Sequence, residues 1–325
     1  MDLDQTFADL QADPALQVRA QAGLVAALAA WQASPQAQPV LAGFAAFADG
    51  TPLAALDALS ALFGGDEAQG ARNFVSPLLK AWSLAMRDQP LGLVPLRHVA
   101  NRASASLLLA AAGEATLTLV ALDSAALNTA PAAQSASFAP SEVWEVILSG
   151  TGEARLVERR GETITAHPLL LEPGLALGRD GEREALLIDA VDAADGALVL
   201  LRLQRRVETM QPRREFALTD GRLLRQASAT PRESRHEVAV ALLGRMGRKD
   251  AAPLLAEIAR DESHGDSLRW QALRECLGLD TATGFWTLTA ISRGGSDPLA
   301  VPAGALRAQL LESYPQLAEV DLCPA

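Results

Sequence analysis

Apolar residues recur at spacings of three to four along the first 92 residues, and this pattern predicts amphipathic helices. Thr51-Pro52 combines an N-cap with proline at the first helical position, and Gly64-Gly65 ends the helix that begins there. The helices with the clearest pattern are expected at residues 15–33, 52–63 and 66–86. Residues 1–92 are therefore predicted to form a helical domain of about five helices.

Residues 93–228 show a different pattern, in which short runs of alternating or β-branched residues are separated by turns that contain glycine. Strands are expected at residues 106–109, 115–122, 143–148, 154–158, 184–191 and 197–203. Asp220-Gly221, between runs at 214–219 and 222–226, is a strong signal for a two-residue hairpin turn. Many short strands with no helix between them predict an antiparallel sandwich or barrel.

Helical periodicity returns in residues 229–325. Two helix pairs and one last helix are expected, at 232–246 with 250–260, at 266–276 with 281–291, and at 302–312. Arg235 and Arg269 occupy corresponding places 34 residues apart, and this weak internal repeat has a period typical of helical solenoids. The predicted fold class is thus α+β with three domains, at 1–92, 93–228 and 229–325.

Composition places the chain among folded globular proteins, because 49% of its 325 residues are hydrophobic and 21% are charged. Its apolar runs are shorter than the roughly 18 residues that a membrane helix needs, and its first residues lack the features of a signal peptide. We therefore expect a cytoplasmic protein. Two cysteines exclude a disulfide framework, and only two of the 28 basic residues are lysines, a bias typical of GC-rich bacterial genomes.

The net charge of −11 disfavours binding to nucleic acid or to an anionic membrane, because both carry like charge. Residues 200–250 differ, since they hold twelve basic residues against six acidic ones. Five arginines of this segment are predicted to bind a protein partner, namely Arg202, Arg205, Arg206, Arg213 and Arg214. Solvated strand and helix faces are the alternative interpretation of the same cluster.

The sequence SEVWEVILSGTG at 141–152 resembles the first conserved stretch of the cupins, and LEPG at 171–174 resembles the Pro-Gly turn that follows it. The resemblance covers about residues 95–206 and implies a jelly-roll β-barrel. Metal-binding cupins carry a His-x-His pair before the acidic strand, whereas this chain has Ser135-Ala136-Ser137 there and no histidine at 175–179. A transition metal needs three or four ligands, so neither a metal nor another cofactor is expected.

The sequences SRHEVAVALLGRMG at 234–247 and DAAPLLAEIA at 250–259 resemble HEAT-like repeats. This resemblance covers about residues 231–314 and implies stacked helix pairs that present a surface to partners. Trp270 and Arg274 lie on the second helix pair and are further candidates for partner binding. Core packing is the alternative interpretation of the tryptophan.

We expect a non-enzymatic interaction protein, an accessory or regulatory subunit that binds a protein partner through its helical repeats and its Arg-rich face. No catalytic residue is predicted, because Gly294-Gly295-Ser296 lacks the context of a nucleophile elbow and Cys276 is expected in the core. The alternative is a metal-independent cupin-type enzyme or small-molecule sensor, with Glu145, Arg155 and Arg202 around an anionic ligand in the barrel cavity. Pairing of sheet edges in a homodimer stays open.

Overall fold

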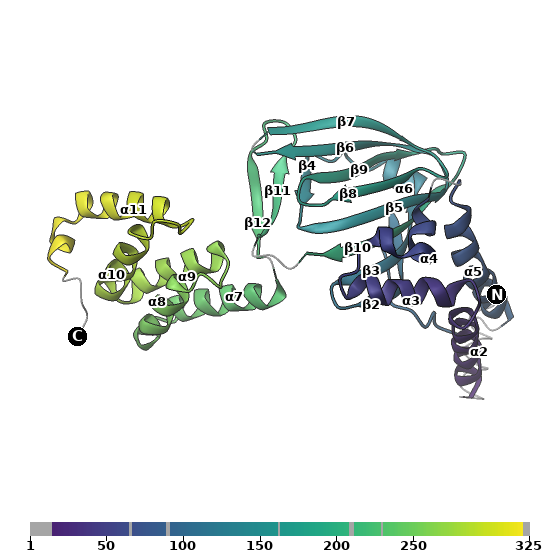
Figure 1. Cartoon of the computed structure of the whole chain (residues 1–325), viewed down its shortest axis with the longest axis horizontal. Helices are drawn as coiled ribbons and strands as arrows, with labels where there is room; N and C mark the ends of the chain where they lie inside the picture. The colour runs from purple at the N-terminus through teal and green to yellow at the C-terminus, as the bar shows by residue number, and fades with distance from the viewer. Residues whose placement is uncertain are drawn as a thin grey trace. The chain divides into compact units, whose positions relative to one another are not determined.

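The computed structural model describes residues 15–64, 67–88, 92–161, 163–207, 211–228 and 230–320 (Figure 1). The chain folds into two compact units. The first comprises residues 1–207 with 217–222, and the second comprises 208–216 with 223–325. No helix within the described ranges is both long enough and apolar enough to span a membrane.

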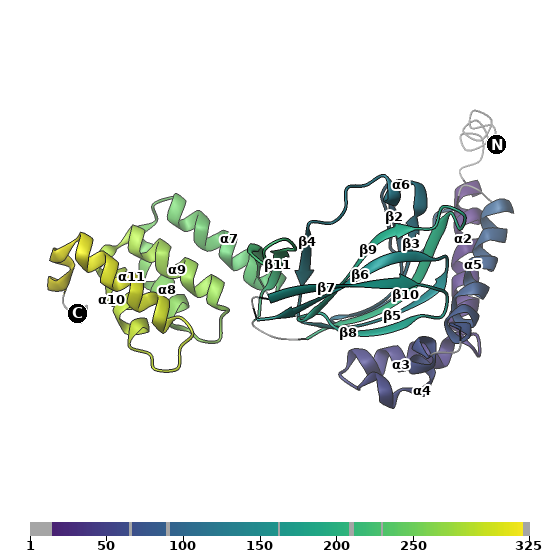
Figure 2. The ribbon, with the colours of Figure 1, turned by 90° about the horizontal axis from the view of Figure 1, so that it is seen from above.

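The first unit begins with helices, namely α2 (Ala15–Gln32), α3 (Ala37–Ala48), α4 (Asp57–Ser60) and α5 (Gln69–Asp88). Figures 1 and 2 show α2 and α5 side by side. The single helix expected at 52–63 is instead broken into η1 (Leu53–Ala55), α4 and η2 (Ala61–Phe63), with non-helical backbone at Leu56. Because of this break, Leu53 and Leu59 both face the core, whereas a continuous helix would hold them about 120° apart.

Two antiparallel sheets follow in the first unit. The larger has the order β1-β2-β3-β10-β5-β8, with β1 (His98–Ala100), β2 (Ser104–Ala112), β3 (Ala115–Asp123), β10 (Ala197–Arg206), β5 (Ser141–Ser149) and β8 (Ala176–Asp180). The smaller has the order β7-β6-β9, with β7 (Thr163–Leu171), β6 (Gly152–Arg160) and β9 (Glu184–Val191). Two short elements, α6 (Ser124–Asn128) and β4 (Ser135–Phe138), lie between β3 and β5 in the chain.

Strand β10 contributes to two hydrophobic clusters, because successive side chains of a strand point to opposite faces. Leu201 and Leu203 pack with helix residues such as Phe47. Leu198 and Leu200 belong to a second cluster, together with side chains from β6, β7 and β9. The helices therefore cover one face of the larger sheet, and the smaller sheet covers the other.

Polar contacts also join the N-terminal helices to the larger sheet. Arg72 of α5 donates hydrogen bonds from Nε and Nη2 to the carbonyl oxygen of Leu148 in β5, at 2.9 and 2.7 Å. A domain boundary between residues 92 and 93 is predicted from the sequence, whereas the helices and sheets share a core and the first compact unit extends to residue 207. Independent folding of residues 1–92 stays a prediction.

The second unit contains a helical region and most of a hairpin, whose residues 217–222 are assigned to the first unit. The hairpin pairs β11 (Arg213–Ala217) with β12 (Leu223–Ala227). The helical region comprises α7 (Pro231–Arg245), η3 (Lys249–Ala251), α8 (Ala252–Arg260), α9 (Asp266–Leu279), α10 (Thr281–Ser292), α11 (Ala300–Ser313) and η4 (Pro315–Glu319). Side chains of α8, α9 and α10, among them Leu255, Cys276 and Leu288, form its core. The expected helical C-terminal region is thus present, and its division into HEAT-like repeats stays a prediction.

Candidate functional site

A groove of about 660 Å³ lies on the helical region of the second unit, between α9 and α11. Its lining residues are Trp270, Arg274 and Leu277 of α9, Thr281 of α10, Leu306 and Leu310 of α11, and Tyr314, Gln316 and Leu317 at and after the end of α11. Residues three and four apart share one face of a helix, so the three α9 side chains form one wall. We call this the α9–α11 groove, and it contains both helical residues predicted from the sequence.

The α9–α11 groove is apolar with a single cation. Arg274 is exposed, and no other residue in the described ranges forms an ion pair or hydrogen bond with its side chain. The described residues that line the groove include no carboxylate. A guanidinium beside an apolar surface is suited to bind a carboxylate that a partner presents together with apolar side chains.

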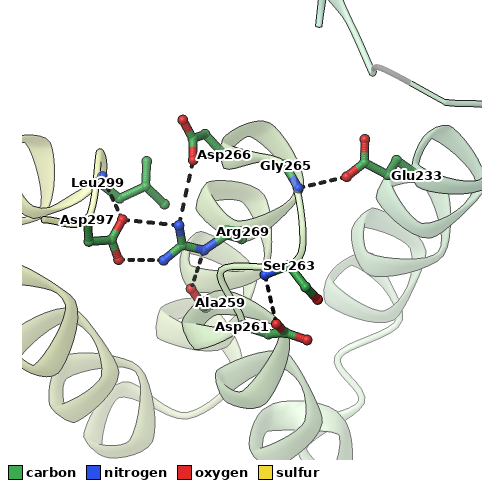
Figure 3. A network of polar contacts seen from close by, with 9 residues as sticks. All are labelled: Glu233, Ala259, Asp261, Ser263, Gly265, Asp266, Arg269, Asp297 and Leu299. Atoms are coloured by element: carbon green, nitrogen blue, oxygen red, sulfur yellow. Dashed lines mark hydrogen bonds and ion pairs between the residues drawn. The ribbon is translucent and has the colours of Figure 1, made fainter. Parts of the chain in front are cut away.

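Arg269, which precedes Trp270 in α9, is buried and fixes the start of that helix (Figure 3). Its Nε donates to the Ala259 carbonyl at 3.1 Å, and its two Nη atoms donate to the Asp297 carboxylate at 3.1 and 2.5 Å. Asp266 lies 3.6 Å from Nη1. These four residues, which we call the Arg269 clamp, connect α8, α9 and the segment between α10 and α11.

The Arg269 clamp holds the two walls of the groove in place. Asp297 also accepts a hydrogen bond from the backbone N–H of Leu299, directly before α11, at 2.9 Å. Hydrogen bonds from Arg269 hold the pKa of Asp297 below its usual value, so the carboxylate stays ionised at neutral pH. At the start of α9, the buried carboxylate of Glu233 from α7 accepts a hydrogen bond from the backbone N–H of Gly265 at 2.7 Å, as Figure 3 shows.

A second buried ionic cluster lies in the first unit and centres on Glu145 of β5, whose side chain is completely buried. Arg179 of β8 donates to its Oε2 at 2.5 and 3.0 Å, and Arg202 of β10 contacts its Oε1 at 2.6 Å. Burial alone would raise the pKa of Glu145, but the charges and hydrogen bonds of Arg202 and Arg179 outweigh it and lower the pKa. The Glu145 carboxylate is therefore ionised, and both of its oxygens accept hydrogen bonds from guanidinium groups.

Two of the five arginines predicted to form one partner face, Arg202 and Arg205, point to opposite faces of the larger sheet. Strand β10 directs Arg202 toward Glu145, whereas Arg205 points to the helices, with its guanidinium carbon 4.2 Å from the Phe47 ring centroid. The reason is the alternation of side chains along a strand. Arg206 is exposed and lies 3.8 Å from Glu114. It stays a partner-binding prediction.

The remaining predicted residues have local partners of their own. Arg214 of β11 lies 3.4 Å from Gln226 of β12, and Arg213 lies exposed on the same hairpin, in contact with other residues. Arg155 of β6 forms a bidentate ion pair with Asp189 of β9 at 2.7 Å. These contacts do not bring Arg155 to Glu145, and a shared anion site of these two residues stays a prediction.

Several site residues were not predicted from the sequence. Arg179 of β8 and Asp297, between α10 and α11, both lie outside the elements predicted from the sequence, so neither carried a local signal. Arg269 did carry one, because its position in α9 places it on the same face as buried Ala272 and Cys276. A charged residue on such a face indicates a buried ion pair.

No group of three or more His, Cys, Asp or Glu side chains within the described ranges is arranged to hold a metal ion. His236 and His264 come nearest to an imidazole pair, with ring centroids 6.1 Å apart and the rings edge to face. Cys276 is completely buried in the helical core, as predicted. Its burial, and to a smaller extent the negative charge of Asp280, raises the pKa of its thiol to about 11.

Comparison with known protein families and with curated proteins finds no match for this chain. Among solved structures, a cupin superfamily protein from Desulfitobacterium hafniense is 13% identical, over 34% of this chain and 83% of that one, with a TM-score of 0.23. KdgF from Halomonas sp. is 14% identical over 34% of this chain and 87% of that one, with a TM-score of 0.25. A cupin-2 domain from Rhodospirillum rubrum is 17% identical over 35% and 72%, with a TM-score of 0.24. These neighbours concern the fold alone, and no activity follows from them.

Proposed function

We propose that this chain is a non-enzymatic accessory or regulatory protein that binds a polypeptide partner in the α9–α11 groove. The observation that carries the proposal is an apolar groove of about 660 Å³ with one exposed cation, Arg274, which has no ion-pair or hydrogen-bond partner among the described residues. We also propose that the sheets form a cupin-like barrel and that the helical region is a short HEAT-like stack. Both finer assignments come from the sequence resemblances.

The residue types in the groove support this function. Trp, Tyr and Arg contribute a large share of binding energy at protein interfaces, because they bury much area and still offer polar groups. Trp270, Arg274 and Tyr314 bring all three types to one site, and Tyr314 is 53% exposed. The Arg269 clamp keeps the walls of this site fixed before a partner arrives, which reduces the entropy cost of binding.

The alternative, a metal-independent enzyme or sensor that uses the barrel interior, has weaker support. Both oxygens of Glu145 are occupied by guanidinium groups, so this carboxylate is not free to accept a proton from a substrate. One observation favours a sensor, namely that Arg202 is 36% exposed although its partner is fully buried. Saturable binding of a small carboxylate that is lost in Arg202→Ala would support this alternative.

Site-specific photocrosslinking tests the proposed function directly. Benzoylphenylalanine is placed at Trp270, at Tyr314 and, as a control, at Val301, which is 83% exposed on the other face of α11. In cells of the natural host, we expect one discrete polypeptide adduct from the two groove positions and none from Val301. The adduct should disappear when Arg274→Glu is added. No adduct from either groove position, or the same adduct from Val301, would refute the proposal.

A further inference from the structure

Helix α7 presents an apolar row to solvent. Val238 and Leu242 of α7 and its C-cap residue Met246 lie four residues apart and therefore on one face, and their exposed fractions are 66%, 55% and 59%. Isolated exposed apolar residues are common on proteins, but a contiguous row at helical spacing marks an interaction site.

Two arginines flank this apolar row. Arg235 and Arg245 lie seven residues before and three residues after Leu242, which places both on the same face of α7. Both are exposed, and neither forms an ion pair or hydrogen bond with any other residue in the described part of the chain. We call these five side chains, Val238, Leu242, Met246, Arg235 and Arg245, the α7 stripe.

The carboxylates of α7 do not neutralise the stripe. Glu233 is buried and accepts a hydrogen bond from the Gly265 backbone at 2.7 Å. Glu237 accepts one from the Ser228 hydroxyl at 2.6 Å. Both point away from the face that carries Leu242, so the stripe is apolar and purely basic.

The internal repeat indicates what kind of element covers the stripe. Val238 and Leu242 correspond, 34 residues further on, to Ala272 and Cys276 of α9, and both of these are completely buried. In α9 the covering elements are helices, since Ala272 and Cys276 belong to one cluster with side chains of α8 and α10. The corresponding face of α7 thus has the character of a helix-packing surface without its second helix.

We propose that the α7 stripe binds an acidic amphipathic helix of another protein. Apolar side chains of that helix cover Val238, Leu242 and Met246, and its carboxylates pair with Arg235 and Arg245. The stripe shares no residue with the α9–α11 groove, so this proposal does not depend on the function proposed for the groove.

Two other occupants fit less well. In a two-fold symmetric dimer the same patch contacts itself, and the α7 stripe offers no carboxylate to the arginines of a second copy. An anionic membrane would be opposed by the net charge of −11, and three apolar side chains bury little area in a bilayer. An acidic helix satisfies both the apolar row and the two cations.

Selection from a peptide library tests the proposal. Random 16-residue peptides displayed on phage are panned against the full chain, and the selected peptides are synthesised and measured by fluorescence anisotropy. We expect the pool to be enriched in Asp, Glu and large apolar residues. Binding should weaken at least about tenfold in Arg235→Glu/Arg245→Glu and in Leu242→Asp, which corresponds to the loss of a central interface residue.

Control variants separate this result from the other interpretations. Arg293→Glu, a reversal of an exposed charge outside both the α7 stripe and the α9–α11 groove, should leave binding of the selected peptides unchanged. Circular dichroism confirms that every variant is folded. A pool without acidic enrichment, or binding that survives both stripe variants, would overturn the proposal. So would co-sedimentation of the wild type, but not of the stripe variants, with vesicles of phosphatidylglycerol and phosphatidylcholine.

Discussion

The substitution Asp297→Asn removes the negative charge that faces Arg269 while it keeps the size of the side chain. The two side chains are only 6% and 2% exposed, so the change leaves a guanidinium buried without its main counter-charge. Breaking a buried ion pair in this way costs about 3 to 5 kcal/mol. Asp266 remains 3.6 Å from the guanidinium, and the Asn oxygen still accepts a hydrogen bond. We therefore expect the free energy of unfolding to fall by about 3 kcal/mol, the lower end of that range.

Pulsed hydrogen exchange at increasing urea measures this loss in the helical region alone, through peptides from α8 to α11. The pH dependence provides a second test. An unperturbed Asp titrates near pH 3.9, and Asp297 has a lower pKa in the folded state. Its stabilising contribution is therefore complete above about pH 4 and is lost as the pH falls through the folded pKa. The difference in unfolding free energy between wild type and Asp297→Asn should therefore become smaller below about pH 4.

Asp266→Asn is the matched control, because Asp266 also faces Arg269 but its side chain is 57% exposed. An exposed ion pair contributes at most about 1 kcal/mol, so this variant should be nearly as stable as the wild type. Equal and small losses in Asp297→Asn and Asp266→Asn would refute the reasoning, since they would mean that water reaches the Arg269 guanidinium. If wild type and Asp297→Asn differed in stability as much at pH 3 as at neutral pH, the stabilisation would not come from the charge of Asp297.

Two further predictions concern the cores of the two units. Arg205→Met should destabilise the first unit by about 2 kcal/mol, because the carbonyl oxygens of Phe47 and Thr51 lose a partly buried donor. Urea denaturation measures this loss, and a change below about 0.5 kcal/mol would contradict it. Cys276, with its pKa raised to about 11 and no exposed surface, should resist iodoacetamide at pH 8 until urea unfolds the chain, as peptide mass mapping reports.

Local sequence signals predicted many of the elements well. The strand expected at 184–191 is β9 with the same bounds, and the helix expected at 281–291 is α10 (Thr281–Ser292). In α10 the signal is chemical as well as periodic, because the Asp280 carboxylate accepts a hydrogen bond from the Thr283 backbone at the helix start. Such elements carry their own caps, turns and periodicity, so neighbours are not needed to define them.

Elements that depend on their neighbours were missed. Strand β7 is the edge strand of its sheet and mostly exposed, so it lacks an alternating apolar pattern, and it tolerates Pro168. Helix α3 is rich in alanine, and its Gly43 lies where a Cβ atom would approach that of Leu59 to 3.2 Å. The site follows the same rule: Trp270 and Arg274 were predicted from α9 itself, but the wall that α11 contributes depends on tertiary packing.

Arg235 and Arg269 show how the neighbours of a helix decide the role of a residue. They lie 34 residues apart at corresponding places in α7 and α9, yet Arg269 is buried against Asp297, whereas Arg235 is exposed and has no ion-pair or hydrogen-bond partner among the described residues. In the proposed HEAT-like stack, α7 would belong to the terminal repeat, and a terminal repeat normally has a polar outer face that keeps the stack soluble. Helix α7 departs from this rule with an apolar row beside its arginine. If an acidic helix covers that row, its carboxylate opposite Arg235 takes the part that Asp297 plays for Arg269. Charge-reversed peptides, with Lys in place of Asp and Glu, should then bind Arg235→Glu/Arg245→Glu more tightly than the wild type.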